Sequence, residues 1–334
     1  MINVSVVGAS GYTGAELVSM LTRHPLADLK SIFVSSGSQD AGKTIDSIHG
    51  FLDRRCCLKL QPLEDPVQAT EEVDAVFLAT DHKVSHDIAE KLILHGCTVF
   101  DLSGAFRVKS PQFYEQNYGF KHEFPDLLDS SVYALCEYVS VDMLKNSRLI
   151  SLPGCYPTAS QLALRPLVDA GLLDPCMAPV INAVSGVSGA GRKASLTNSF
   201  CEVSLNAYGV FKHRHRPEIE AHLGTKVVFT PHLGNFKRGI LATVTAKLVE
   251  GTSEDTVRTT FLRAYKDSRL VRIKDTWPRV DDVADTPFCD IFFACEGEYI
   301  VICSAIDNLL KGASAQAVQA FNLYYDFDET LSLI

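Results

Sequence analysis

Three glycines near the start of the chain constrain its fold more than any other feature. Gly8, Gly11 and Gly14 join an apolar run, Val4–Val7, to a helical stretch, Ala15–His24. Glycines here allow a tight turn and let main-chain N–H groups approach a phosphate, while the helix N-terminus adds the positive end of its dipole. The spacing is G-x-x-G-x-x-G rather than G-x-G-x-x-G, so the interpretation depends on the place between a strand and a helix. We expect this loop to bind a dinucleotide through Gly8, Ser10, Gly11, Tyr12, Thr13 and Gly14.

The first 150 residues alternate apolar runs with helical stretches, a pattern typical of a parallel sheet with crossover helices. Later in the chain, longer runs rich in Val, Phe and Thr predict a second domain with a mixed or antiparallel sheet. Further strands are predicted at Leu29–Val34, Ala75–Ala79, Thr98–Leu102, Val227–Thr230, Ile240–Val249 and Tyr299–Ala305, and a helix at Val84–His95.

The length of 334 residues predicts two domains. We predict an α/β fold: a dinucleotide-binding, parallel-sheet domain at 1–152 and a second, α+β domain at 153–311. The alanine-rich segment 312–334 is predicted to form a helix that packs back on the first domain.

Composition narrows the class of protein. A net charge of −9 argues against a nucleic-acid surface, because duplex binding requires phosphates to be neutralised. No apolar run reaches the roughly 18 residues of a membrane span, and the first residues lack the pattern of a secretion signal. The ten cysteines include no C-x-x-C pair, which favours free thiols. We therefore expect a soluble, cytoplasmic protein without a nucleic-acid or membrane partner.

The end of the second strand indicates the type of nicotinamide cofactor. An NAD site usually has Asp or Glu there, about 20 residues after the glycines, to bind the ribose 2′-hydroxyl. Here the strand ends in Ser35 and Ser36, with Lys43 nearby. Hydroxyls and an ammonium group suit a 2′-phosphate, which a carboxylate would repel. The sequence therefore predicts NADP, and an ordinary serine turn is the alternative.

One cysteine has an unusual sequence context, Pro153-Gly154-Cys155-Tyr156-Pro157-Thr158. Pro157 suits the first turn of a helix, so a helix is predicted to begin there. A thiol at a helix N-terminus has its pKa lowered from about 8.5, and main-chain N–H groups there can stabilise an oxyanion. We predict that Cys155 is a nucleophile; the alternative, a buried apolar residue, is accepted for the other nine cysteines.

The densest ionisable cluster is Lys212-His213-Arg214-His215-Arg216-Pro217-Glu218. A thiolate enzyme needs an acid or base near neutral pH, which histidine provides, and Glu218 can orient it. Pro217 disfavours helix at the preceding residue, so an extended segment with both imidazoles on one face is predicted. We favour His213 as the acid/base and His215 as a contact for a substrate carboxylate, with the reverse left open. A metal is not predicted, because H-x-H lacks a third ligand.

Three other sites suit a ligand but also fit structural roles. Arg107 follows the carboxyl end of a predicted strand and suits a phosphate. Ser185 and Gly186 begin a second glycine-rich loop that ends at Arg192, a second candidate for substrate or phosphate. Asn308, before the last helix, suits a nicotinamide amide.

Together these motifs resemble those of the N-acetyl-gamma-glutamyl-phosphate reductases in their shorter bacterial form. The resemblance covers essentially the whole chain and is most specific around Cys155, at 185–192, at 213–218 and at 231–234. It implies NADPH-dependent reduction of an acyl phosphate to an aldehyde in arginine biosynthesis, by a homo-oligomer (dimer or tetramer) whose second domain binds substrate and dimerises. It also implies that Cys155 is the nucleophile and that the acid/base lies within 213–215. The related aspartate-semialdehyde dehydrogenases have a phosphate-binding arginine at the position of Arg107.

The resemblance implies a mechanism in which the Cys155 thiolate displaces phosphate from the substrate and the resulting thioester is reduced. Two other interpretations remain open. An enzyme of the aspartate-semialdehyde dehydrogenase type, acting on another acyl phosphate, would use the same chemistry. A non-catalytic NADP-sensing regulator would leave Cys155 without a role. A thiol hydrolase is a third possibility, but it would leave the glycine loop unused.

Overall fold

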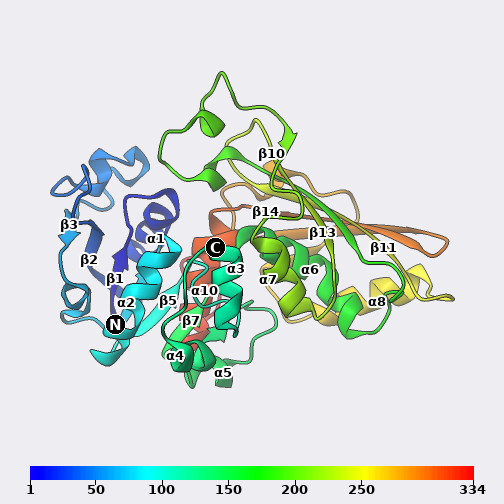
Figure 1. Cartoon of the computed structure of the whole chain (residues 1–334), viewed down its shortest axis with the longest axis horizontal. Coiled ribbons are helices and arrows are strands. Elements are labelled where there is room, and N and C mark those ends of the chain that lie inside the picture. Colours follow the sequence, from blue (N-terminus) through cyan, green and yellow to red (C-terminus); the bar gives the residue numbers. More distant parts are fainter. The chain divides into compact units, whose positions relative to one another are not determined.

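The computed structural model describes residues 1–334 and divides them into two compact units. One unit contains residues 1–154 with 313–334, and the other contains residues 155–312. Figure 1 shows their elements in sequence colours. No helix in the structure combines the length and the hydropathy that crossing a bilayer would require.

The first unit is built on a seven-stranded sheet in the order β3-β2-β1-β4-β5-β7-β6, with every neighbouring pair parallel. All residues of β4 and β5 are buried, as expected for central parallel strands covered on both faces. The strands are β1 Ile2–Val7, β2 Ala27–Ser35, β3 Leu60–Leu63, β4 Ala75–Leu78, β5 Thr98–Asp101, β6 Val132–Tyr133 and β7 Leu149–Ser151.

Helices surround this sheet, and the C-terminal helix belongs to the same unit. Helix α10 packs on α1 and α5, and it is drawn in red in Figure 1. Its Asn322 lies 2.8 Å from the ring of His24, and the hydroxyl of Thr98 donates to that of Tyr324. The helices are α1 Tyr12–Thr22, α2 His82–Leu94, α3 Pro111–Tyr118, α4 Pro125–Ser130, α5 Val141–Lys145 and α10 Ala315–Tyr324, with 3-10 turns at Ile45–Ser47, Gly50–Leu52 and Pro66–Thr70.

The second unit has a mixed seven-stranded sheet in the order β12-β13-β14-β11-β8-β10-β9. Buried and part-buried residues alternate along β11, because one face carries helix α6, on which α7 and α8 pack. The strands are β8 Val180–Ser185, β9 Asn206–Ala207, β10 Val228–Leu233, β11 Ile240–Lys247, β12 Val271–Ile273, β13 Cys289–Glu296 and β14 Tyr299–Ile306. The helices are α6 Cys155–Asp169, α7 His215–Leu223, α8 Glu254–Ala264 and α9 Val280–Val283. There are also 3-10 turns at Val187–Ala190 and Leu196–Asn198, and a π-helical turn at Leu310–Ser314.

The predicted fold class, a parallel-sheet domain with a second α+β domain, is confirmed. The start of one helix was predicted two residues too late: α6 begins at Cys155 rather than at Pro157. Pro157 is its third residue, where the main-chain nitrogen needs no partner within the helix, so proline is tolerated there without being the first residue.

Candidate active site

The glycine loop lies between β1 and α1, at the carboxyl end of a strand whose neighbours are β2 and β4. The strand order reverses at this point, and such a position is where open α/β sheets bind ligands. Gly8 has φ +86°, and a Cβ on it would lie 2.3 Å from the carbonyl oxygen of Ala79. A Cβ on Gly14 would lie 2.3 Å from the Gly8 carbonyl oxygen. Both positions therefore require glycine.

The N-terminus of α1 fits a phosphate group. The N-cap residue is Gly11, which has no side chain to cap the helix. The first turn begins with Tyr12 and Thr13 and contains no acidic residue that would repel a phosphate. The carbonyl oxygen of Ser10 lies 2.9 Å from Nε2 of His49. Main-chain N–H groups at an uncapped helix start bind an anion directly, so these residues suit a pyrophosphate.

The predicted 2′-phosphate residues lie where β2 ends. Ser35 and Ser36 are exposed. The ammonium group of Lys43 forms an ion pair with the carboxylate of Asp40 at 3.1 Å. The positive charge of Lys43, which suggested NADP, is therefore paired with a carboxylate. The sequence did not indicate this ion pair.

Arg107 is 5 % exposed and contacts the main chain. Its Nε donates to the carbonyl oxygen of Leu152 at 2.7 Å, and Nη2 donates to that of Leu102 at 2.9 Å. Burial raises the pKa of Asp101, and its interactions with Ser103 and Arg107 oppose this rise. Arg107 thus holds the segment three residues before Cys155, and the phosphate role that the sequence suggested stays a prediction.

Cys155 is the first residue of α6 and is part-buried. Such a position places the thiol near the positive end of the helix dipole. Tyr156 donates its hydroxyl to the carbonyl oxygen of His232 at 2.9 Å, and the Tyr208 hydroxyl donates to that of Tyr156 at 3.5 Å. Burial raises the pKa of both tyrosines, and the negative charge of ionised Cys155 adds to this rise.

The two histidines lie together, but not in the predicted extended conformation. Helix α7 begins at His215, with the helical residue Arg214 as its N-cap. Pro217 is the third helical residue, where its missing N–H costs no hydrogen bond, so its effect on the preceding residue does not prevent a helix. The ring centroids of His213 and His215 are 4.8 Å apart, and they lie 5.7 and 5.9 Å from the ring of Tyr156.

The environments of these histidines differ. The main-chain N–H of His215 donates to Nδ1 of His213 at 3.2 Å. Burial, together with the smaller effect of the neighbouring positive charge of Arg214, lowers the pKa of His213 to about 4. His215 is 8 % exposed, and Glu218 is fully buried in the first turn of α7, where the helix dipole favours a carboxylate.

The second glycine-rich loop is tied to residues 236–239. Ser185 ends β8, and a Cβ on Gly186 would lie 2.6 Å from the main-chain nitrogen of Arg238. Asn308 accepts from the Gly239 N–H at 2.6 Å and donates to the Ser188 hydroxyl at 3.0 Å. The carboxamide predicted to bind nicotinamide therefore also holds the loop.

The remaining predicted residue, Arg192, is exposed beyond this loop. No group of three or more His, Cys, Asp or Glu side chains in the structure is arranged to hold a metal ion. Sequence reasoning missed Tyr156 and Tyr208 as neighbours of the histidines, and Asp307 as the buried centre of a polar network. Tyr156 lies inside the cysteine motif, and the Tyr208 ring contacts that of His213, five residues along the chain. The bond from Tyr208 to Tyr156 and the pairing of Asp307 with Arg238 join distant segments and leave no local sequence pattern.

Comparison with known proteins gives the family. The family model for the semialdehyde dehydrogenase NAD-binding domain matches residues 3–146. The family model for the semialdehyde dehydrogenase dimerisation domain matches residues 155–308. The chain therefore has an NAD-binding domain of this type.

Solved structures show the same fold at low identity. A probable aspartate-semialdehyde dehydrogenase from Pseudomonas aeruginosa superposes with a TM-score of 0.71 and 21 % identity, covering 97 % of this chain and 98 % of the other. Aspartate-semialdehyde dehydrogenase with NADP from Candida albicans gives a TM-score of 0.70 and 14 % identity, over 97 % and 98 %.

Full-length relatives are much more similar in sequence. An N-acetyl-gamma-glutamyl-phosphate reductase from Vibrio parahaemolyticus is 56 % identical, and one from Pectobacterium carotovorum is 55 % identical, each over 100 % of both chains. At this identity over the complete length, the chain belongs to the N-acetyl-gamma-glutamyl-phosphate reductase family.

Proposed function

We propose that the protein reduces N-acetyl-gamma-glutamyl phosphate to N-acetylglutamate semialdehyde with NADPH and releases phosphate, a step of arginine biosynthesis. The observation that carries the proposal is the position of Cys155 as the first residue of α6, followed by a tyrosine whose ring lies beside His213 and His215. Full-length identity of 56 % to a reductase of that name supports the same substrate.

The chemistry begins with the Cys155 thiolate, which attacks the acyl carbon of the acyl phosphate. The C–S bond forms, the C–O bond to phosphate breaks, and inorganic phosphate leaves with the bonding electron pair. Main-chain N–H groups at the start of α6 stabilise the oxyanion of the tetrahedral state. Splitting the reduction at a thioester replaces one high barrier by two lower ones.

The nicotinamide supplies the hydride when it is bound. Because Nδ1 of His213 accepts the His215 N–H, the neutral ring carries its proton on Nε2. We assign this N–H to the oxygen of the thioester, where it stabilises the negative charge that develops during reduction. When the C–S bond breaks, the aldehyde leaves and the Cys155 thiolate is restored. His215 and Glu218 complete the site, with His215 assigned to the substrate carboxylate.

The cofactor of the proposal is NADP. Ser35 and Ser36 are exposed at the end of β2, where hydroxyls can donate to a 2′-phosphate. The glycine loop and the uncapped start of α1 suit the pyrophosphate. In the second unit, Ser185, Gly186 and Asn308 are assigned to the nicotinamide.

The anion contacts of the proposal are Arg107 for the leaving phosphate and Arg192 for the substrate. We assign residues 1–152 to NADP binding, with 312–334 packed against them, and residues 153–311 to catalysis and dimerisation. The match to a dimerisation domain supports a homo-oligomer. The ten cysteines form no disulfide, as is usual in reducing compartments, which supports a cytoplasmic location.

The test is the reverse reaction: oxidation of purified semialdehydes in the presence of NADP and inorganic phosphate, followed by absorbance of the reduced cofactor. N-acetylglutamate semialdehyde should react with the highest kcat/KM. A higher value for aspartate semialdehyde would favour an enzyme acting on aspartyl phosphate. If no semialdehyde reacts while NADP still binds, the protein is a cofactor-binding regulator instead.

A further inference from the structure

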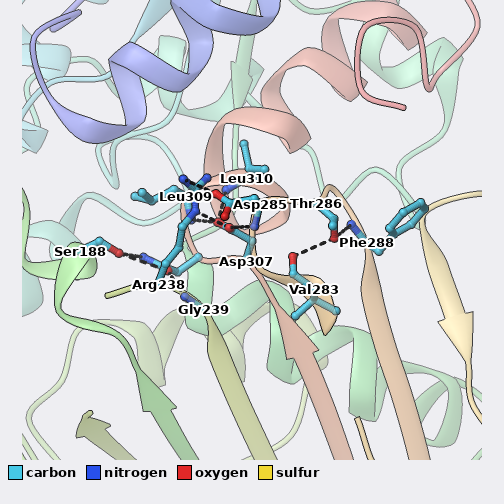
Figure 2. Close-up of polar contacts among 11 residues, drawn as sticks. Ser188, Arg238, Gly239, Val283, Asp285, Thr286, Phe288, Asp307, Leu309 and Leu310 are labelled. Carbon is cyan, nitrogen blue, oxygen red and sulfur yellow. Dashed lines mark hydrogen bonds and ion pairs between the residues drawn. The ribbon is translucent and has the colours of Figure 1, made fainter. Parts of the chain in front are cut away.

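A fully buried carboxylate lies at the centre of the polar network in Figure 2. Asp307, directly after β14, pairs through Oδ2 with the guanidinium of Arg238. The same oxygen accepts from the main-chain N–H of Asp285 at 2.7 Å. Its other oxygen, Oδ1, accepts from the N–H groups of Leu309 and Leu310 at 2.8 and 2.9 Å. Both oxygens are therefore used to hold main chain, and the charge is neutralised by an arginine.

The main chain of Asp307 holds the next turn as well. Its carbonyl oxygen accepts from the N–H of Gly312 at 2.9 Å, a bond that spans five residues. A π-helical turn follows over Leu310–Ser314, and isolated π turns are frequent at functional sites. The side chain and the carbonyl of one residue thus fix the segment from 307 to 312.

Gly312 lies directly against the proposed nucleophile. A Cβ on Gly312 would come within 2.8 Å of the Cβ of Cys155 and 3.2 Å of its Cα. Gly312 is not among the glycines with positive φ, so space rather than backbone conformation requires glycine here. The backbone of Gly312 therefore lies close beside the Cα and Cβ of Cys155.

A second contact anchors the same segment. Asn308 bonds to Gly239 and Ser188, as described above. Arg238 also forms an ion pair with Asp285 at 2.9 Å. Asp307 is fully buried and the Arg238 side chain is 19 % exposed, so desolvating this pair is costly, and good hydrogen-bond geometry is what offsets that cost. The start of the turn that carries Gly312 is consequently held against the main chain at Gly239 and Asp285 and the hydroxyl of Ser188.

We propose that Asp307 is a positioning residue for Cys155, which it orients through Gly312. The inference rests on the proposed role of Cys155 as the nucleophile. Asp307 holds the turn, Gly312 contacts the Cβ of the cysteine, and the thiol is directed to the N–H groups at the start of α6, where the thiolate is stabilised. Loss of this contact should raise the pKa of the thiol and reduce the rate of attack.

Two variants test the proposal at different points of the chain of contacts. Asp307→Asn keeps the shape but presents N–H donors where acceptors are needed and removes the charge that pairs with Arg238. Gly312→Ala leaves the side chain of Asp307 unchanged and adds a methyl group 2.8 Å from the Cβ of Cys155 and 3.3 Å from the Asp307 carbonyl oxygen. Asp290→Asn is the matched control: Asp290, on β13, is 1 % exposed and pairs with Arg272 of β12 rather than with residues of this turn.

Four quantities are measured on each full-length variant: kcat and KM in the reverse reaction, Kd for NADPH, and the rate of iodoacetamide labelling of the Cys155 peptide against pH by mass spectrometry. Both test variants should lose about 10²-fold in kcat, the size expected for a misplaced reacting group. Their Kd for NADPH should stay within about twofold of wild type, and the labelling midpoint should move to higher pH. Asp290→Asn should keep the wild-type kcat and labelling profile.

A wild-type kcat and labelling midpoint in both variants would overturn the proposal, even if their melting temperatures fell, because Asp307 would then be structural only. If Asp307→Asn does not fold, Asp307→Glu, which keeps the charge but displaces the carboxylate, takes its place, with the same expected losses. Failure of the proposed function has a different readout: the wild-type protein would oxidise no semialdehyde, whereas the labelling profile would still report whether Asp307 and Gly312 orient the thiol.

Discussion

The main-chain N–H of His215 donates a hydrogen bond to Nδ1 of His213 across 3.2 Å. A ring nitrogen that accepts carries no proton, so neutral His213 has its proton on Nε2. Burial lowers the pKa of this ring to about 4, and Arg214 adds to the effect. His213 is therefore a neutral hydrogen-bond donor over the pH range in which the reaction would be assayed.

The first prediction separates the two histidines by kinetics. His213→Asn should lower kcat by about 10²–10⁴-fold, because the donor to the developing oxyanion is misplaced. His215→Asn should mainly raise KM, because a uniform binding contact is lost. The measurement is kcat and KM from pH 5 to 9. Since the pKa of His213 is about 4, the wild-type kcat profile should show no limb from this residue near pH 6.5. A kcat loss confined to His215→Asn would reverse the assignment.

The second prediction concerns stability in acid. His122 is buried and accepts the N–H of Phe124 at Nδ1, and burial lowers its pKa to about 4. Between pH 6.5 and 4 the unfolded chain binds more protons than the folded one, so stability falls as pH drops through this window. The urea midpoint of wild type should decrease from pH 7 to pH 4.5, and it should decrease less in His122→Asn. The exposed His95 provides the control: His95→Asn should follow wild type, and equal slopes in all three proteins would contradict the prediction.

The third prediction tests the two roles of Arg107. Its contacts with the carbonyl oxygens of Leu102 and Leu152 mean that Arg107→Leu should lower stability as well as activity. If it also binds the leaving phosphate, KM for phosphate in the reverse reaction should rise far more than KM for NADP. Arg107→Lys should recover only part, because lysine keeps the charge but loses the planar fork. An unchanged phosphate KM with a lower melting temperature would show that the arginine is structural alone.

The sequence was sufficient to predict features that depend on neighbouring residues. The glycine loop was predictable because its strand, turn and helix are contiguous. A helix start close to Cys155 was predictable to within two residues, because a proline-flanked helix start has a local pattern. The extended conformation predicted for the histidine segment was wrong, because the spacing does not say whether Pro217 lies in the first turn of a helix. Asp307 was missed because its partner Arg238 is 69 residues away, and no local pattern reports such a contact.

The fourth prediction concerns cofactor choice. NADPH should be preferred over NADH by at least about tenfold in kcat/KM, equivalent to 1.4 kcal/mol of differential binding. Lys43→Ala should reduce this preference if its ammonium group reaches the 2′-phosphate as well as Asp40. Lys30 also pairs with an aspartate, Asp28, but within β2 and away from its carboxyl end. Lys30→Ala is therefore the control and should leave the preference for NADPH unchanged. Comparable kcat/KM for both cofactors in wild type would refute the assignment to NADP.

The last prediction is that Cys155 is the only catalytic thiol. Cys155→Ser should lose nearly all turnover and keep its affinity for NADPH, because a serine hydroxyl is not ionised at pH 7 and the fold around it is unchanged. The exposed Cys57 is the control, because its environment disfavours the thiolate: its hydrogen bond to the Asp46 carboxylate raises the pKa of its thiol. Cys57→Ser and Cys56→Ser should therefore stay near wild-type activity, and iodoacetamide at neutral pH should label Cys155 faster than Cys57. The measurements are kcat by the reverse assay and labelling by peptide mass spectrometry. If Cys155→Ser retains more than a few per cent of kcat, the reaction does not pass through a thioester on this residue.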